Sequence, residues 1–316
     1  MIGNLINRVL RPAGLQLRRL PAKQVPKAKA DTTVRDGIIQ KLRSTPMEGA
    51  LHLELATWYL ENGMPATAFS EIRTAAFLGA DPAKCEAVQQ RTTAVLPPLL
   101  ELAHNRYYRM HTMAQAIRRM ADGARVTVLD VGGGNGELAQ FVPEVDYCLA
   151  EPRVNGIAGE ALPFNDGSFD IVVSCHVLEH IPIADRPAFL DTLMSKARTG
   201  VILLNPFHVD GPNSVEGLQL ILDITGESWA QEHLDCTVPR TEDVESYAAS
   251  RGLVCKLTPN AMKAASFGFV WVDYFSLKAK LREPWRRINR YMNTNLIEGV
   301  DSSELPSAYL VELTRA

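Results

Sequence analysis

The spacing of apolar residues changes near residue 125. Between residues 31 and 122, apolar positions recur three and four residues apart, a spacing that is typical of helices, and we expect residues 98–122 to form one helix. Beyond that point, short apolar runs alternate with helical patterns such as ADRPAFLDTLMSKA and TEDVESYAASRG. The runs are VTVLDV, VDYCLAE, FDIVVSC, TGVILLN, GLVCKLT and AYLVEL. This alternation predicts an α/β fold, with a mainly parallel sheet covered by helices on both faces and a small all-α region before it.

The all-α region, residues 31–97, contains two helical patterns that are joined at Gly63. Pro65 suits the first turn of the second helix. The hairpin resembles one tetratricopeptide repeat. The matching packing residues are Leu55, Ala56, Tyr59, Ala68, Ile72 and Ala75. Because a repeat groove needs several copies and one is recognisable, we expect the hairpin to pack on its neighbours, with docking of a protein partner as the alternative.

The N-terminal segment, residues 1–30, is rich in Lys and Arg and precedes the first acid, Asp31. Its early apolar residues recur on one helical face. The segment therefore predicts a short amphipathic helix that Pro12 and Gly14 break, and residues 2–20 are expected to contact an anionic membrane, with a frayed basic tail or a transit peptide as alternatives. Residues 21–36 lack periodicity and predict a linker.

Composition narrows the classes of function. Apolar residues make up 46% of the chain and charged residues 22%, which is the balance of a globular protein, and the net charge of -3 argues against a nucleic-acid partner. The five cysteines are widely spaced and odd in number, which indicates a reducing compartment. No window approaches the roughly 20 apolar residues that span a bilayer. We expect a cytoplasmic protein, with peripheral contact at the inner membrane face as the alternative.

A glycine-rich loop follows the first predicted strand, in the run VLDVGGGNG. Glycines at alternate positions, Gly132, Gly134 and Gly136, let the main chain turn sharply and approach a ligand closely. Such a loop alone is equally compatible with a dinucleotide. The G-x-G-x-G spacing is tighter than the dinucleotide pattern, and Asp130 would repel phosphates but stabilise an ammonium group. Glu151 ends the next strand, where a carboxylate can accept bonds from ribose hydroxyls.

The runs VLDVGGGNGELA, LAEP and GEALPFNDGSFDIVVSCHVLEHIP resemble the type 11 group of class I S-adenosylmethionine-dependent methyltransferases, whose catalytic domain is Rossmann-like. The resemblance is strong over about residues 126–207, so we assign residues 98–316 to this domain, with a helical insertion at about 260–300. It implies S-adenosyl-L-methionine as the cofactor. The implied cofactor-binding residues are Asp130, Gly132, Gly134, Gly136, Glu151, Leu162 and Phe164.

The chain departs from the family pattern at the adenine site. The aspartate that bonds the adenine amino group is replaced by Ala158 or Gly159, with Glu160 as a possible substitute. Too few residues separate the second strand from LPF for a full crossover, so we expect a very short third strand and a trimmed sheet edge. Leu162 and Phe164 are expected to sandwich the adenine, although Phe164 is nearly as well explained as a core residue.

The segment from His176 to His180 reads H-x-x-E-H, a pattern that can bind zinc on a helix. Because it follows a parallel strand and Pro182 leaves little helix, we predict no metal. Methyl transfer mainly requires alignment of the acceptor, and an alcohol acceptor must also lose its proton. The candidate catalytic residues are His176, His208 and His233, with Asp210 beside them, and each is also explained as a surface or capping residue.

The insertion contains aromatic residues that could line an acceptor pocket and arginines that could meet phosphate or an anionic surface. These are Phe267, Phe269, Trp271, Tyr274, Phe275, Arg282, Arg286, Arg287 and Arg290. An amphipathic lid helix with a solvated basic face is the alternative. The basic start and late insertion resemble methyltransferases of bacterial surface polysaccharides, which implies polysaccharide biosynthesis and a sugar hydroxyl as acceptor.

Other functions remain open at this stage. The acceptor could instead be a small phenolic, quinone-like or lipid molecule. A non-catalytic S-adenosylmethionine-binding scaffold that docks partners through the hairpin is a further alternative, and an oxidoreductase is another.

Overall fold

The computed structural model describes residues 32–208, 214–296 and 306–316. Thr33–Ala316 form one compact unit. The N-terminal stretch expected to contact a membrane, residues 2–20, and the candidate Asp210 lie outside the described residues.

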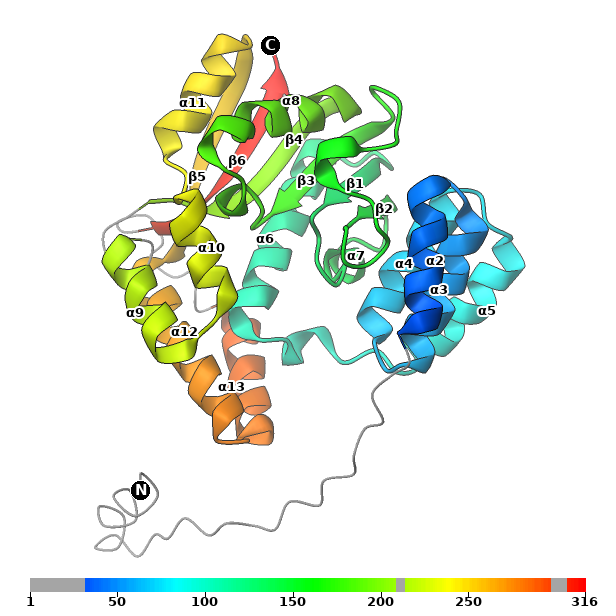
Figure 1. Cartoon of the computed structure of the whole chain (residues 1–316), viewed down its shortest axis with the longest axis horizontal. Helices are drawn as coiled ribbons and strands as arrows, with labels where there is room; N and C mark the ends of the chain where they lie inside the picture. The colour runs from blue at the N-terminus through cyan, green and yellow to red at the C-terminus, as the bar shows by residue number, and fades with distance from the viewer. Residues whose placement is uncertain (1–31, 209–213, 297–305) are drawn as a thin grey trace, which may run out of the picture. The chain divides into compact units, whose positions relative to one another are not determined.

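One sheet of six strands forms the centre of the unit, in the order β2-β1-β3-β4-β6-β5 (Figure 1). The strands are β1 (Thr127–Val131), β2 (Asp146–Ala150), β3 (Phe169–Cys175), β4 (Ala197–Pro206), β5 (Leu253–Met262) and β6 (Pro306–Arg315). β1 pairs in parallel with β2 and β3, and β3 with β4, whereas β6 is antiparallel to both β4 and β5. The predicted sheet is confirmed, and all six predicted strands are present.

Helices cover both faces of the sheet and one of its edges (Figure 1). They are α2 (Thr33–Ser44), α3 (Gly49–Glu61), α4 (Pro65–Phe77), α5 (Pro82–Thr93), α6 (His104–Ala121), α7 (Leu138–Phe141), α8 (Arg186–Lys196), α9 (Val215–Thr225), α10 (Ser228–Cys236), α11 (Thr241–Ser250), α12 (Lys263–Lys278) and α13 (Arg282–Asn295). Short 3₁₀ turns lie at Leu99–Glu101, Gly159–Ala161, Leu178–His180 and Ile183–Asp185.

Side chains that alternate between the two faces of the strands divide the hydrophobic core into two clusters. Val128 packs with Ile117 of α6 on one face, whereas its neighbour Leu129 packs in the other cluster with Phe189 of α8 and Val244 of α11. All five side chains are at least nine-tenths buried. Because successive side chains of a strand point to opposite faces, one apolar strand supports both layers.

The helical hairpin α3–α4 takes the place of a third strand beside β2 (Figure 1). The main-chain N–H of Leu149 donates to Thr74 Oγ1 at 2.9 Å, and Asn155 Nδ2 donates to the carbonyl of Leu149 at 2.9 Å. No strand lies between Ala150 and Phe169, a stretch that is described throughout. The trimmed edge predicted from the sequence is confirmed, but the very short third strand expected there is absent, because the hairpin packs against β2 instead. Side chains therefore satisfy the edge that another strand would otherwise pair.

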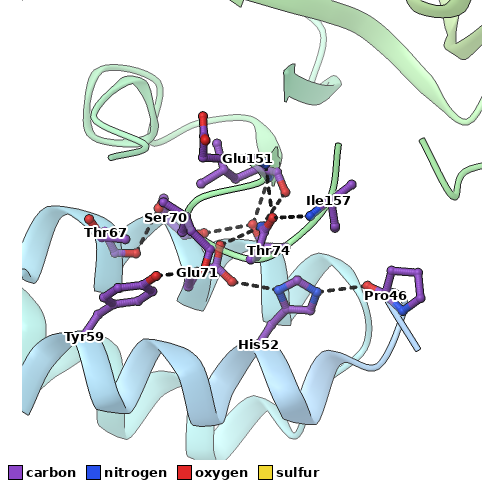
Figure 2. Close-up of polar contacts among 12 residues, drawn as sticks. Pro46, His52, Tyr59, Thr67, Ser70, Glu71, Thr74, Glu151 and Ile157 are labelled. Atoms are coloured by element: carbon purple, nitrogen blue, oxygen red, sulfur yellow. Dashed lines mark hydrogen bonds and ion pairs between the residues drawn. The ribbon is translucent and has the colours of Figure 1, made fainter. Parts of the chain in front are cut away.

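A buried polar network fastens the hairpin to this edge, as Figure 2 shows. His52 Nδ1 lies 2.7 Å from Glu71 Oε2, and Glu71 Oε1 accepts from Asn155 Nδ2 at 2.8 Å. Asn155 Oδ1 accepts in turn from the main-chain N–H of Glu151 at 3.1 Å. Tyr59 donates to the carbonyl of Val154 at 2.7 Å. The hairpin thus packs on its neighbours, and it is tied directly to the end of β2.

Two sequence expectations need correction in the helical region. The predicted linker, residues 21–36, is too long, because α2 begins at Thr33 and buries Ile38 and Leu42. The start of α2 was assigned to the linker because the Lys- and Pro-rich stretch directly before it has no periodicity. The single helix expected over residues 98–122 is divided into a 3₁₀ turn and α6.

The predicted insertion is helical, as α12 and α13. Trp285, Asn289 and Met292 of α13 are buried, while its four arginines are exposed, which fits a lid helix with a solvated basic face. Among the described residues, none of the helices combines the length and the apolar character needed to cross a bilayer. All five cysteines are free.

Candidate functional site

The glycine loop leaves the carboxyl end of β1 in a conformation that favours glycine. Gly132, Gly134 and Gly136 have φ values of +72°, +55° and +68°. A Cβ atom on Gly132 would lie 2.4 Å from Val177 Cγ2, and one on Gly136 would lie 2.2 Å from Ser70 Oγ, whereas Gly134 faces open space. The loop is therefore tightly packed on both flanks and open at its tip, where a ligand can approach the main chain.

Two acids flank this tip. Asp130 is buried, Tyr147 donates to its Oδ2 at 2.7 Å, and its Oδ1 has no hydrogen-bond partner in the structure. Burial raises the pKa of Asp130 to about 7, and the Glu151 carboxylate adds to the rise while the Tyr147 bond opposes it. Glu151 accepts from the main-chain N–H of Gly134 at 3.0 Å and of Arg153 at 3.1 Å. The two acids lie at the ends of adjacent strands, as the sequence predicts.

The residues expected to enclose the adenine are largely buried. Leu162 and Phe164 belong to the core cluster on the α8 face, and Phe164 makes an edge contact with Phe169, with ring centroids 4.9 Å apart. This placement matches the alternative interpretation of Phe164 as a core residue. Glu160 is exposed on a 3₁₀ turn.

A cluster of histidines and one buried carboxylate lies beyond the end of β3. His176 has a φ of +56°, and its Nδ1 lies 3.1 Å from Glu179 Oε1. Glu179 is fully buried and accepts from Asn205 Nδ2 at 2.6 Å. His180 Nε2 lies 3.3 Å from His233 Nε2, and His233 Nε2 lies 3.8 Å from Glu179 Oε1. Left-handed backbone at a histidine is uncommon and often marks a functional site.

The neighbouring groups favour ionisation of Glu179, whereas burial disfavours protonation of His176 and His233. Burial opposes ionisation of Glu179, but the charge and hydrogen bond of His176 and the charge of His233 outweigh it and bring its pKa to about 2. Burial lowers the pKa of His233 to about 4, although Glu179 opposes this. Burial and the Arg109 guanidinium lower the pKa of His176.

The cluster lines a cavity of about 540 Å³ between the carboxyl ends of the strands and the helices α6, α9, α10 and α12. Its lining includes Asn105, Arg109, His176, Glu179, His180, Pro206, Ile221, Thr225, Glu227, Trp229, His233, Asn260, Val270, Asp273, Tyr274, Leu277, Ser307 and Ala308. Val177, which contacts the glycine loop, directly follows His176, which lines the cavity. The loop and the cavity therefore adjoin at the end of β3, where open α/β sheets bind ligands.

The predicted catalytic histidines are only partly brought together. His176 and His233 line the cavity, whereas His208 is not part of that lining and uses its main-chain N–H to donate to Pro239 O at 2.8 Å. Of the five aromatic residues proposed for the acceptor pocket, Tyr274 alone belongs to the lining described by the structure. The sequence analysis missed Arg109, whose only signal was a polar position on a helix that precedes β1.

Comparison with known proteins identifies the kind of domain that the chain contains. Residues 102–255 match the family model described as "Methyltransferase domain". Two curated relatives from Mycobacterium sp. (strains KMS and MCS), each described as an uncharacterized methyltransferase, are 38% identical over 85 residues. That match covers 22% of this chain and 33% of each relative, so the chain spans about a third of the length of the curated relatives it matches.

Solved structures with similar folds include Haemonchus contortus phosphoethanolamine N-methyltransferase 2 in complex with S-adenosyl-L-methionine. It is 13% identical, with a TM-score of 0.42 over 65% of this chain and 53% of that one. A SAM-dependent methyltransferase from Archaeoglobus fulgidus is 15% identical, with a TM-score of 0.39 over 65% of this chain and 94% of that one.

The sequence prediction of the class of protein is confirmed by the family match. The chain contains a class I, S-adenosylmethionine-dependent methyltransferase domain.

Proposed function

We propose that this protein transfers the methyl group of S-adenosylmethionine to a hydroxyl group of an acceptor held in the cavity. The observation that supports this most directly is the His176–Glu179 pair, with Nδ1 3.1 Å from a buried carboxylate oxygen, on the wall of a cavity that adjoins the glycine loop. An imidazole oriented by a carboxylate is suited to accept a proton from an alcohol.

The cofactor would be held by the loop and the two acids. The open tip at Gly134 admits a ligand to the main chain, and the unpartnered Asp130 Oδ1 suits the ammonium of the methionine part. Glu151 would exchange its bond from Gly134 for bonds from the ribose hydroxyls. Leu162 and Phe164 would border the adenine through the edges that the core leaves free.

The reaction needs alignment and one proton transfer. The acceptor oxygen forms a bond to the methyl carbon while the carbon–sulfur bond breaks, and the electron pair of that bond remains on sulfur as a neutral thioether. The hydroxyl proton passes to His176. Because the leaving group is neutral, this chain contributes mainly by orienting the acceptor and by accepting that proton.

A sugar is the acceptor that we favour. The cavity wall contains polar groups from several elements, among them Asn105, Arg109, Glu227 and Asp273, which can bond a molecule with many hydroxyls. A phenolic, quinone-like or lipid acceptor is the second candidate, supported by Trp229 and by the other apolar residues of the same wall. Methyl transfer to any of these acceptors distinguishes an enzyme from a scaffold that only binds the cofactor.

Cofactor binding is tested by changing Gly134 to leucine. The side chain would occupy the open tip, so we expect loss of S-adenosylhomocysteine binding in calorimetry. Gly252→Leu is the matched control, because Gly252 also has a positive φ, +64°, with nothing within 4 Å of an added Cβ. Unchanged S-adenosylhomocysteine affinity in Gly134→Leu would refute this cofactor site.

The base is tested with His176→Asn, since asparagine tolerates left-handed backbone better than most residues. We expect kcat for a hydroxylated acceptor to fall by about 10²–10⁴ while S-adenosylhomocysteine affinity stays the same. The assay follows S-adenosylhomocysteine formation with a panel of nucleotide sugars, free glycans and phenols. A variant as active as the wild type would remove His176 from the mechanism.

A further inference from the structure

Three side chains on the cavity wall bring potential metal-binding atoms close together. These atoms are one carboxylate oxygen of Glu179 and one ring nitrogen each of His180 and His233, and all lie within 4.8 Å of one another. The two Nε2 atoms are 3.3 Å apart, and His233 Nε2 is 3.8 Å from Glu179 Oε1. Ligand atoms about 2.0–2.1 Å from a tetrahedral metal lie about 3.3–3.4 Å from each other, so these two separations are close to those of a formed site.

The orientation of His180 supports the same assignment. Its Nδ1 lies 2.8 Å from Glu232 Oε2, which is an ion-pair distance without hydrogen-bond geometry. The other ring nitrogen, Nε2, lies 3.3 Å from His233 Nε2. A carboxylate next to the second ring nitrogen of a metal-binding histidine is common around metal sites.

The elements that supply the three ligands are joined firmly. His180 ends the 3₁₀ turn Leu178–His180, and Cys236, the last residue of α10, donates its Sγ–H to the carbonyl of His180 at 3.3 Å. Arg186 donates to the carbonyls of Ile181 and Cys236, at 3.0 and 2.9 Å. The turn and α10 are thus held together before any ligand binds, which lowers the cost of assembling a metal site.

We propose that Glu179, His180 and His233 bind one divalent first-row transition-metal ion, with its remaining positions open to the cavity. Two imidazoles and a carboxylate suit zinc, cobalt, manganese or iron(II), and three protein ligands with an open position are typical of catalytic sites. This differs from the sequence-based prediction of no metal. That prediction considered only ligands on one helix, whereas the third ligand comes from α10, far away in the sequence.

The role of the ion rests on the proposed methyl transfer to a hydroxyl group. An acceptor hydroxyl in an open coordination position loses its proton more readily, as metal-bound water does. The proton passes to His176, whose ring lies beside Glu179, and the oxygen then forms its bond to the methyl carbon. The oxidation state of the ion is unchanged throughout.

Metal binding is measured first without any substrate. The full chain is stripped with EDTA, desalted and titrated with Zn²⁺ by calorimetry, and separately with Co²⁺ by visible absorption. We expect about one tightly bound ion per chain, with a Co²⁺ spectrum typical of four or five ligands. His180→Ala and His233→Ala should each abolish this stoichiometric binding, and Glu232→Gln should weaken it by roughly 10–100-fold.

His111→Ala is the matched control, because His111 lies on α6 and is not part of the cluster. It should bind metal like the wild type. Thermal melts of His180→Ala establish that the variant is folded, and its partly exposed side chain makes it the safer of the two ligand variants. Less than stoichiometric binding by the wild type, or binding that neither ligand variant reduces, would overturn the proposal.

S-adenosylhomocysteine binding separates this proposal from the methyltransferase proposal. His233→Ala should retain the cofactor affinity of the wild type while it loses the metal. A chain that binds metal but no cofactor would refute the proposed function and leave the metal site in place. If the chain binds no metal and methylates an acceptor equally well with and without EDTA, the metal site is refuted, whereas the proposed methyltransferase function is unaffected.

Discussion

Replacing the buried His52 with alanine tests the energetics of the junction between the hairpin and the sheet. The side chain of His52 is fully buried, with Nδ1 2.7 Å from Glu71 Oε2 and Nε2 3.0 Å from the carbonyl of Pro46 (Figure 2). Both partners accept hydrogen bonds, so the ring donates from both nitrogens and its positive charge pairs with Glu71. His52→Ala would leave a buried carboxylate without its counter-ion.

The expected cost follows from that geometry. Breaking a buried pair by removing one partner costs about 3–5 kcal/mol, which is a large part of a typical total stability of about 5–15 kcal/mol. At about 2 °C per kcal/mol for a chain of this size, Tm should fall by roughly 6–10 °C. Urea unfolding followed by circular dichroism measures the free energy directly.

The second variant, His52→Ala with Glu71→Gln, identifies the cause. Glutamine removes the unpaired charge and keeps an oxygen to accept from Asn155, so we expect the double variant to regain at least about 1 kcal/mol relative to His52→Ala. The reasoning is refuted if the double variant is no more stable than His52→Ala, because the unpaired charge would then not be the source of the loss.

The same pair predicts how stability changes with pH. Burial lowers the pKa of His52, but the charge and hydrogen bond of Glu71 and the Pro46 carbonyl more than offset it, so the folded-state pKa is raised above 6.5. The folded state therefore binds this proton more tightly than the unfolded chain. The contribution of protonated His52 to the stability is fully present below pH 6.5 and is lost as the pH rises through the folded-state pKa. The stability difference between the wild type and the double variant should narrow from pH 6 to pH 9.

Two further predictions concern β1 and β2, the strands next to the glycine loop. Because burial raises the pKa of Asp130 to about 7, binding a cationic ammonium at its free oxygen should release close to one proton at pH 6 and far less at pH 8. Calorimetry of S-adenosylhomocysteine in buffers of different ionisation enthalpy measures this release, and Asp130→Asn should abolish it. Thr74→Val removes the acceptor for the Leu149 N–H and should cost about 1–3 kcal/mol in urea unfolding, whereas Thr93→Val, at an exposed bond within α5, should cost less than about 1 kcal/mol.

The strands and the glycine loop could be predicted from the sequence because their signals are local. Apolar runs between polar segments gave all six strands, and the alternate glycines after Asp130 placed the loop at the end of β1. The acid at the end of β2, Glu151, follows from the same strand boundaries. Each of these features depends on a few neighbouring residues, and no distant contact is needed to recognise it.

The cavity could not be assembled from the sequence, because its wall joins segments that are far apart in the chain. His176 and His233 were both named as candidates, but nothing local indicates that α10 folds back onto the turn at His180. His176 directly follows the last residue of β3 and His208 lies two residues beyond the last residue of β4, so their positions in the sequence do not show that only His176 faces the cavity. Tertiary contacts decide which of several equally placed histidines face the same cavity.

The hairpin shows how such a distant contact reaches the cofactor loop. Glu71 accepts from Asn155, and Asn155 accepts from the main-chain N–H of Glu151, so the buried charge pair fixes the residue that also contacts Gly134. On its other side, Ser70 of α4 fills the space against Gly136. A helix that replaces a third strand therefore does more than cover an edge. It packs against one end of the loop at Gly136 and, through Glu151, fixes its tip at Gly134, so loosening the hairpin should weaken cofactor binding before it disturbs the rest of the sheet.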